Sequence, residues 1–165
     1  MLEVRIAGLS LDAVTEQPVL LLVPAVESET EGGVQRAMPI WIGNAEATAI
    51  LLGIQGIEPP RPMTHDLMKS ALEVVGFFVS RVEITRLEEG TFYASLVLRG
   101  EDREIAIDAR PSDSIALALR FGCPVFIDED IFEEAAVSVT EVDEEEEVER
   151  FRDFLDHVDP ADFMS

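Results

Sequence analysis

Three polar-rich stretches interrupt the apolar pattern of the sequence: residues 41–46 (WIGNAE), 58–66 (EPPRPMTHD) and 108–113 (DARPSD). Each lies at or just before the start of an expected helix, where backbone N–H groups and the helix dipole favour anions. Clustered carboxylates with a histidine can hold a divalent cation, and neighbouring arginines can bind phosphate through paired N–H groups. Such a combination suits metal-assisted hydrolysis of a phosphodiester. The candidate residues are Glu46, Glu58, Arg61, His65, Asp66, Asp108, Arg110, Ser112 and Asp113.

The acidic candidates are expected to bind metal. We assign Glu46, Asp66, Asp108 and Asp113 as ligands of Mg²⁺ or Mn²⁺, because these hard cations prefer oxygen ligands. His65 is expected to be a general base or a further ligand, and the catalytic set is His65, Asp66, Asp108 and Asp113. A bound cation would also reverse the local field that repels phosphate from an acidic protein.

The basic candidates are expected to bind the substrate. Arg61 and Arg110 would hold the scissile phosphate, with Ser112 beside them at the start of a helix. Ser112 also has a structural interpretation as a helix N-cap. No histidine lies beside it in the sequence to activate it as a nucleophile.

The other candidates have structural interpretations too. Glu46 would complement the positive end of a helix dipole. His65 and Asp66 follow Thr64 and would complete the capping of the next helix. Asp108 and Asp113 would form a salt-bridge network with the arginine between them. The sequence leaves these alternatives open beside the functional ones.

The charge and composition limit the class of protein. The chain of 165 residues has 34 acidic and 12 basic side chains and a net charge of −22, which opposes the electrostatic attraction that drives non-specific nucleic-acid binding. Its single cysteine, Cys123, agrees with a reducing compartment. No uncharged apolar run reaches the ~18 residues that span a bilayer. We therefore expect a cytoplasmic protein that does not enter a membrane.

The apolar pattern predicts an α+β fold, with helices packed on a mixed, mostly antiparallel sheet. Period-2 alternation indicates strands, and apolar residues at helical spacing after Asn44, Thr64 and Pro111 indicate helices. The expected strands cover residues 2–11, 17–26, 37–42, 77–87, 91–99, 103–109 and 124–127, and the expected helices cover residues 44–55, 64–75 and 114–121, with one or two helical turns in 128–136.

The charge distribution divides the chain into a domain over residues 1–137 and an acidic linker with a C-terminal amphipathic helix over residues 138–165. Residues 127–165 hold 16 acidic and 2 basic side chains, so most of the excess charge lies there. Residues 148–158 have apolar side chains at helical spacing and could dock on the domain.

Four stretches together resemble the bifunctional nuclease family. They are residues 39–50 (PIWIGNAEATAI), 58–68 (EPPRPMTHDLM), 91–98 (TFYASLVL) and 107–127 (IDARPSDSIALALRFGCPVFI), which have counterparts in that family in the same order. The similarity covers about residues 1–137 and leaves the acidic tail outside.

The resemblance implies an α+β domain that assembles as a homodimer and acts as a nuclease on both DNA and RNA. It does not supply a set of catalytic residues, so the assignments above rest on their chemistry. The first, apolar strands and the stretch around Trp41 are the expected dimer surface, because an exposed strand edge must be paired or covered. The alternative function is a non-catalytic dimeric module that binds a small anionic ligand or a protein partner.

Overall fold

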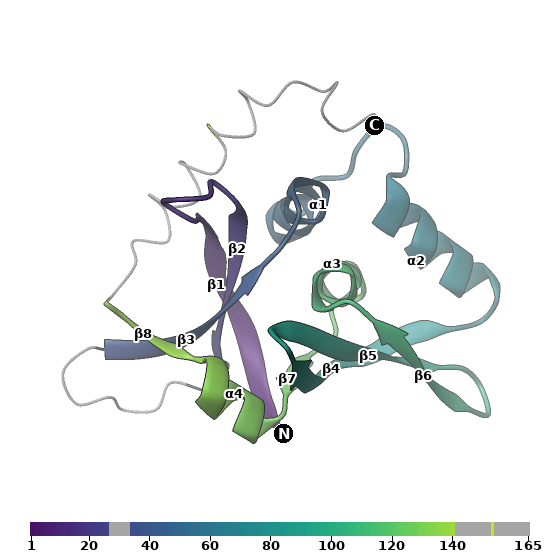
Figure 1. Cartoon of the computed structure of the whole chain (residues 1–165). Coiled ribbons are helices and arrows are strands. Elements are labelled where there is room, and N and C mark those ends of the chain that lie inside the picture. Colours follow the sequence, from purple (N-terminus) through teal and green to yellow (C-terminus); the bar gives the residue numbers. More distant parts are fainter. Residues whose placement is uncertain (27–33, 141–152, 154–165) are drawn as a thin grey trace.

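The computed structural model describes residues 1–26, 34–140 and 153. Within these residues the chain folds into one sheet with helices packed on it (Figure 1). The strands are β1 (Leu2–Leu11), β2 (Pro18–Pro24), β3 (Val34–Trp41), β4 (Phe78–Glu88), β5 (Thr91–Arg99), β6 (Glu104–Ala109), β7 (Val125–Ile127) and β8 (Val137–Thr140). The helices are α1 (Asn44–Gln55), α2 (Thr64–Val74), α3 (Pro111–Phe121) and α4 (Glu129–Ala135).

The sheet has the strand order β6-β5-β4-β7-β1-β2-β3-β8. Every neighbouring pair is antiparallel except β4 and β7. The short strand β7 therefore joins a β4–β6 meander to the strands from the N-terminal part of the chain. The expected α+β fold with a mostly antiparallel sheet is confirmed.

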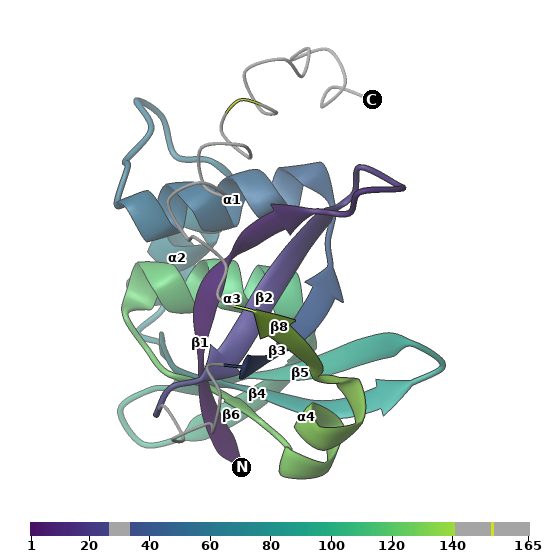
Figure 2. The same ribbon diagram turned by 90° about the vertical axis from the view of Figure 1, so that its left-hand side faces the viewer.

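The helices α1, α2 and α3 form a layer on one side of the sheet, and α4 lies apart from them near β3 and β8 (Figures 1 and 2). Period-2 alternation places one face of β2, β4 and β5 against this layer. The fully buried side chains come from both layers, so a single core holds helices and sheet together. The largest of them include Leu20, Leu22, Met38, Ile50, Ile84, Ile115, Leu117 and Ile127.

The N-cap of each helix that carries candidate residues lies one or two residues earlier than the sequence predicts. Gly43 is the N-cap of α1 in place of Asn44, and Met63 is the N-cap of α2 in place of Thr64. The carboxylate of Asp66 reaches back and accepts a hydrogen bond from the Met63 backbone N–H (3.0 Å). The Asp66 side chain, in the first turn of α2, thus caps this helix in place of a side chain at the N-cap position.

The N-cap of α3 also lies earlier in the sequence than expected. Arg110 is its N-cap and Pro111 its first residue, which suits a proline because that position has no intrahelical N–H bond to lose. The expected N-cap, Ser112, is instead a buried residue in the first turn. The expectation that Ser112 caps this helix is therefore wrong.

The strand edges also differ from the expectation. β1 lies between β7 and β2, and β2 lies between β1 and β3, so the first strands have no open edge for a dimer partner. The edges belong to β6 and β8, and the sequence did not predict β8. The expected C-terminal helix lies outside the described residues. Within those residues, no helix is both long and apolar enough to cross a membrane.

Candidate functional site

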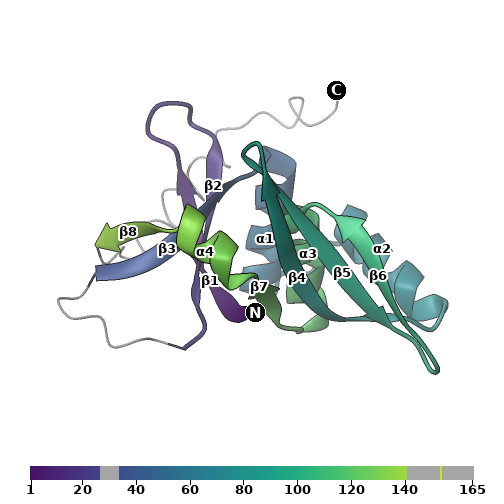
Figure 3. The ribbon, with the colours of Figure 1, turned by 60° about the horizontal axis from the view of Figure 1, so that its bottom comes forward.

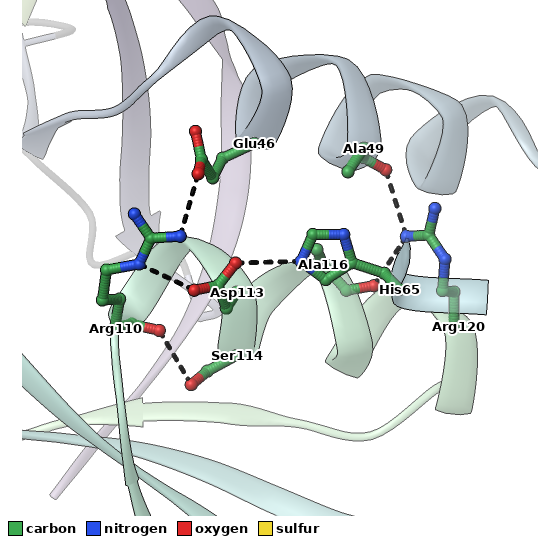
Figure 4. Close-up of polar contacts among 8 residues, drawn as sticks. All are labelled: Glu46, Ala49, His65, Arg110, Asp113, Ser114, Ala116 and Arg120. Atoms are coloured by element: carbon green, nitrogen blue, oxygen red, sulfur yellow. Dashed lines mark hydrogen bonds and ion pairs between the residues drawn. The ribbon is translucent and has the colours of Figure 1, made fainter. Parts of the chain in front are cut away.

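The N-terminal ends of α1 and α3 meet at the side chain of Arg110 (Figure 4). Its Nη2 donates to Oε1 of Glu46 in the first turn of α1 (2.8 Å), and its Nε donates to Oδ2 of Asp113 in the first turn of α3 (2.7 Å). The Arg110 side chain is nevertheless 65% exposed. Two carboxylates therefore fix an arginine in one orientation at the protein surface.

Asp113 also binds the first turn of α2. Its Oδ1 lies 2.9 Å from Nε2 of His65, whose side chain is only 12% exposed. An ionised carboxylate can only accept hydrogen bonds, so Nε2 carries a proton and Nδ1 is the nitrogen able to accept one. Asp113 thus orients both His65 and Arg110, and we call these three residues with Glu46 the Arg110 network.

A second ion pair lies beside this network and anchors α2 to α3. Nε of Arg120 donates to Oδ1 of Asp66 (2.7 Å), and its Nη1 donates to the backbone carbonyls of Ala49 and Ala116 (3.1 and 2.8 Å). The Arg120 side chain is 9% exposed. A single buried guanidinium therefore ties together α1, α2 and α3.

A glycine leaves space for the Glu46 carboxylate. A Cβ added to Gly43, the N-cap of α1, would collide with Oε2 of Glu46. Glu46 therefore folds back over the start of its own helix, where the dipole favours a negative charge, while Oε1 reaches Arg110. The structural and the functional interpretations of Glu46 apply together.

The pKa values reflect these contacts. Burial raises the pKa of Asp113, but hydrogen bonds from Arg110 and His65 outweigh it and hold the pKa below its ordinary value. The pKa of Asp66 is lowered in the same way, with burial opposed by Arg120 and the Met63 N–H. Hydrogen bonds to Asp113 and Glu46 raise the pKa of Arg110. These contacts therefore favour the ionised forms of Asp66, Asp113 and Arg110.

Five of the nine candidate residues lie outside the Arg110 network: Asp66, which pairs with Arg120, and four others. Asp108 is exposed on β6, on the face opposite to Ile105 and Ala109, which pack against the core. Arg61 is exposed in the loop before α2 and has no ion pair or hydrogen bond with the described residues. Ser112 is buried in the first turn of α3. Glu58 is exposed in the same loop as Arg61.

The four carboxylates expected to bind a metal are not gathered into one site. Glu46 and Asp113 have the Arg110 guanidinium between them, Asp66 is paired with Arg120, and Asp108 faces the other side of the sheet. Among the described residues, no three side chains of His, Cys, Asp or Glu are grouped so that they could hold a metal ion. The donor set therefore does not fit the expected four-carboxylate centre.

Two residues that the sequence interpretation left out belong to this region. Arg120 stands in an otherwise apolar run (SIALALRF), and a lone charge in such a run is a signal of a buried ion pair. Ser114 is fully buried, and its Oγ donates to the backbone carbonyl of Arg110 (2.9 Å). A serine at this position gives no signal that separates it from an ordinary helix residue.

The residues of this site lie inside a region that matches a known family. The model of the bifunctional nuclease domain matches residues 28–140, which include the whole Arg110 network and Arg120. This match covers more than half of the chain. The chain therefore belongs to the bifunctional nuclease domain family, as the sequence motifs indicated.

Individual relatives agree with this assignment. An uncharacterized protein of Mycobacterium tuberculosis is 44% identical over 171 residues, which cover 99% of this chain and 98% of that protein. Bifunctional nuclease 1 of Oryza sativa subsp. japonica is 29% identical over 104 residues, covering 61% of this chain and 31% of the rice protein. Bifunctional nuclease 1 of Arabidopsis thaliana is 26% identical over 105 residues, covering 62% and 32%. The named nucleases are thus similar over one part of their length.

Proposed function

We propose that this chain is a nuclease of low sequence specificity that hydrolyses phosphodiester bonds in DNA and RNA, and that it works as a homodimer. Family membership supports the class of reaction. The observation that carries the proposal is the position of Arg110, an exposed guanidinium held by two carboxylates where two helices begin.

Arg110 is arranged to contact a phosphate. Its Nε and Nη2 are bonded to Asp113 and Glu46, whereas its Nη1 has no hydrogen bond with the described residues. A guanidinium fixed before the substrate arrives can stabilise charge on a non-bridging phosphate oxygen without reorganising. Backbone N–H groups at the start of α1 and α3 offset part of the negative charge of Glu46 and Asp113.

His65 is the candidate general base. With Nε2 bonded to Asp113, its Nδ1 accepts the proton of a water molecule that attacks phosphorus. A new phosphorus–oxygen bond forms, the bond to the leaving oxygen breaks, and that oxygen takes a proton from solvent. Because the His65 side chain is 12% exposed, water must reach the ring between α1 and α3 for this step.

The divalent metal remains a prediction. Mg²⁺ is commonly held by one or two carboxylates together with substrate phosphates, and there it would neutralise developing charge. The four expected ligands do not form a centre, so the steps above use only side chains of the chain itself. Cleavage in EDTA, compared with cleavage in Mg²⁺ and in Mn²⁺, tests the metal separately.

The test is cleavage of labelled single- and double-stranded DNA and RNA by the native protein and by a His65→Ala/Asp113→Ala variant purified identically. We expect the native protein to cleave and the variant to lose activity. Equal cleavage by both proteins contradicts this site and indicates another site or a contaminating nuclease. Absence of cleavage in both contradicts the proposed activity.

A single substitution separates the chemical from the structural role of His65. The amide nitrogen of a glutamine can take the position of Nε2 and keep the hydrogen bond to Asp113, but glutamine accepts no proton. His65→Gln should therefore leave the melting temperature close to native and lower the cleavage rate by about 10²–10⁴-fold. Native activity in this variant would show that His65 only holds α2 in place.

The second candidate function is a non-catalytic dimeric module that binds a small anionic ligand or a protein partner. The low exposure of His65 and the net charge of −22 favour it. Such a module would show a saturable rise in melting temperature with an anionic ligand and no turnover. A nuclease would instead show cleavage that falls steeply with salt.

A further inference from the structure

The helix α2 is amphipathic, but its apolar face points away from the protein. Leu67, Val74 and Val75 are 62%, 85% and 66% exposed, and Met68 and Ala71 on the same face are also exposed. None of the eleven residues of α2 is buried. Of the long apolar side chains of α2, Leu72 alone packs against the core.

Polar side chains hold the opposite face of α2 to the body of the protein. His65 binds Asp113, Asp66 binds Arg120, and Nζ of Lys69 lies 5.5 Å from the centroid of the Phe121 ring. The helix lies at the outer edge of the helical layer, next to α3 (Figures 1 and 3). Because the polar face is already used inside the protein, the apolar face is left for another molecule.

Further exposed apolar side chains lie before and after α2 in the sequence. Among the described residues, most large apolar side chains that are at least 44% exposed lie between Ile54 and Phe78. Ile57 and Met63 are two further examples in this segment. Contiguous exposed apolar surface on a soluble protein marks an interaction site. We call Leu67, Met68, Ala71, Val74 and Val75 the outer face of α2.

The charge distribution indicates what covers this face. Residues 54–78 hold three acidic and two basic side chains, a net charge of −1, whereas the whole chain has −22. Two copies of such an acidic protein repel each other. The repulsion is weakest where the two surfaces that meet are both nearly neutral. The outer face of α2 contains no charged residue at all.

The order of the residues on this face is self-complementary. Leu67 and Met68 precede Ala71 by four and three positions, and Val74 and Val75 follow it by three and four. In an antiparallel pair with Ala71 at the axis, the two long side chains of one helix meet the two short ones of the other. Small alanines at the crossing allow the helices to approach closely, and a two-fold axis makes each contact occur twice.

We propose that two copies of this chain associate through the outer face of α2, with the two α2 helices antiparallel about a two-fold axis at Ala71. This inference rests on the homodimer of the proposed function and names its surface. It also gives the interface a role in the site, because pairing fixes the helix whose first turn carries His65 and Asp66.

The first test uses two matched substitutions and the molar mass in solution. Val74→Glu places a charge on the outer face, and Val14→Glu makes the same change at a residue of equal type and 90% exposure in the turn after β1. Light scattering after size exclusion should give native protein and Val14→Glu twice the chain mass of 18.2 kDa, and Val74→Glu one chain mass. Circular dichroism checks that both variants fold.

The second test examines the two-fold arrangement. Ala71→Cys should form a disulfide-linked dimer under mild oxidation, because the two Cα atoms near the axis can approach within about 4.4–6.8 Å. Thr91→Cys, an exposed position at the start of β5, is the control and should remain unlinked. The native chain has only Cys123, which is partly buried.

Each result decides a different point. If the native protein is monomeric at all concentrations, both the homodimer and the proposed dimer surface are wrong. This holds even if another protein is later found to cover α2. A native dimer that survives Val74→Glu keeps the homodimer and overturns this surface. A Val74→Glu monomer without cross-linking of Ala71→Cys overturns the two-fold pairing. None of these results depends on whether the protein cleaves nucleic acid.

Discussion

His65 and Asp113 are joined by a hydrogen bond of 2.9 Å although they are 48 residues apart in the sequence. The contact links the first turn of α2 to the first turn of α3, and Asp113 uses its second oxygen for Arg110. One carboxylate thus positions both the candidate base and the candidate phosphate ligand. The geometry of the site therefore depends on Asp113 and not on the metal centre that the sequence predicted.

We expect Asp113→Ala to lower the free energy of unfolding by about 1–3 kcal/mol, because it removes the acceptor that Arg110 and His65 share. Urea unfolding followed by circular dichroism measures the change. Asp108→Ala is the matched control, since Asp108 is exposed on β6, and it should change the stability by less than about 0.5 kcal/mol. Equal effects of the two substitutions would contradict the structural role of Asp113.

Arg120→Ala should be more destabilising, by about 3 kcal/mol, because it leaves Asp66 without its charged partner and removes two hydrogen bonds to backbone carbonyls. Arg86→Ala removes an exposed ion pair with Glu88 and should cost at most about 1 kcal/mol. The melting temperatures of the two variants make the comparison. A small effect of Arg120→Ala would show that α2 is held mainly by other contacts.

The fold could be predicted from the sequence to a large extent. The alternation in residues 2–11, the hairpin around Gly90 and the αL glycines that end α1 and α3 act locally, so a single sequence reveals them. The strand β8 could not be found, because its four residues gain their structure by pairing with β3. The order of strands likewise depends on contacts distant in the sequence.

The site could be predicted only as a set of motifs. The sequence identified Glu46, His65, Arg110 and Asp113, which the structure brings together. The sequence interpretation also included Asp108, which is only two residues from Arg110. Successive residues along a strand point to alternate sides, and Asp108 lies on the face of β6 that does not pack against the core. The direction of a side chain near the end of a strand depends on the residue at which the strand ends. The motif alone does not show which residue that is.

Asp66 and Asp113 should make the stability of the protein fall in acid. The pKa values of Asp66 and Asp113 are lower in the folded protein than their ordinary value of 3.8, so their contribution is present above that pH and is lost as pH falls through the folded values. The free energy of unfolding, measured from pH 7 to pH 2, should decrease below about pH 4. An Asp66→Asn/Asp113→Asn variant should show a smaller decrease, and an unchanged slope would contradict the assignment.

Trp41 should report the ionisation of Asp12. Its indole N–H donates to Oδ2 of Asp12 (3.1 Å), and the backbone N–H groups of Thr15 and Val14 with this indole lower the Asp12 pKa to about 2. Because Trp41 is the single tryptophan, its fluorescence should change with a midpoint near pH 2. The transition should disappear in Asp12→Asn, and a midpoint near 3.8 would contradict the contact.

Cys123 should react slowly with thiol reagents. Burial raises the pKa of its thiol to about 11, so little thiolate exists at pH 8. Ellman's reagent should modify the native protein far more slowly than the protein unfolded in urea. Equal rates in the two states would show that the thiol is accessible and not perturbed.

The measurement that tests the central claim most directly compares Arg110→Gln with Arg86→Gln in the cleavage of labelled DNA and RNA. Both substitutions remove one positive charge from an exposed arginine, but only Arg110 belongs to the network. We expect kcat/KM to fall by about 10²–10³-fold in Arg110→Gln and to stay within about three-fold of native in Arg86→Gln. Equal cleavage by the native protein and both variants would contradict a nuclease centre at Arg110.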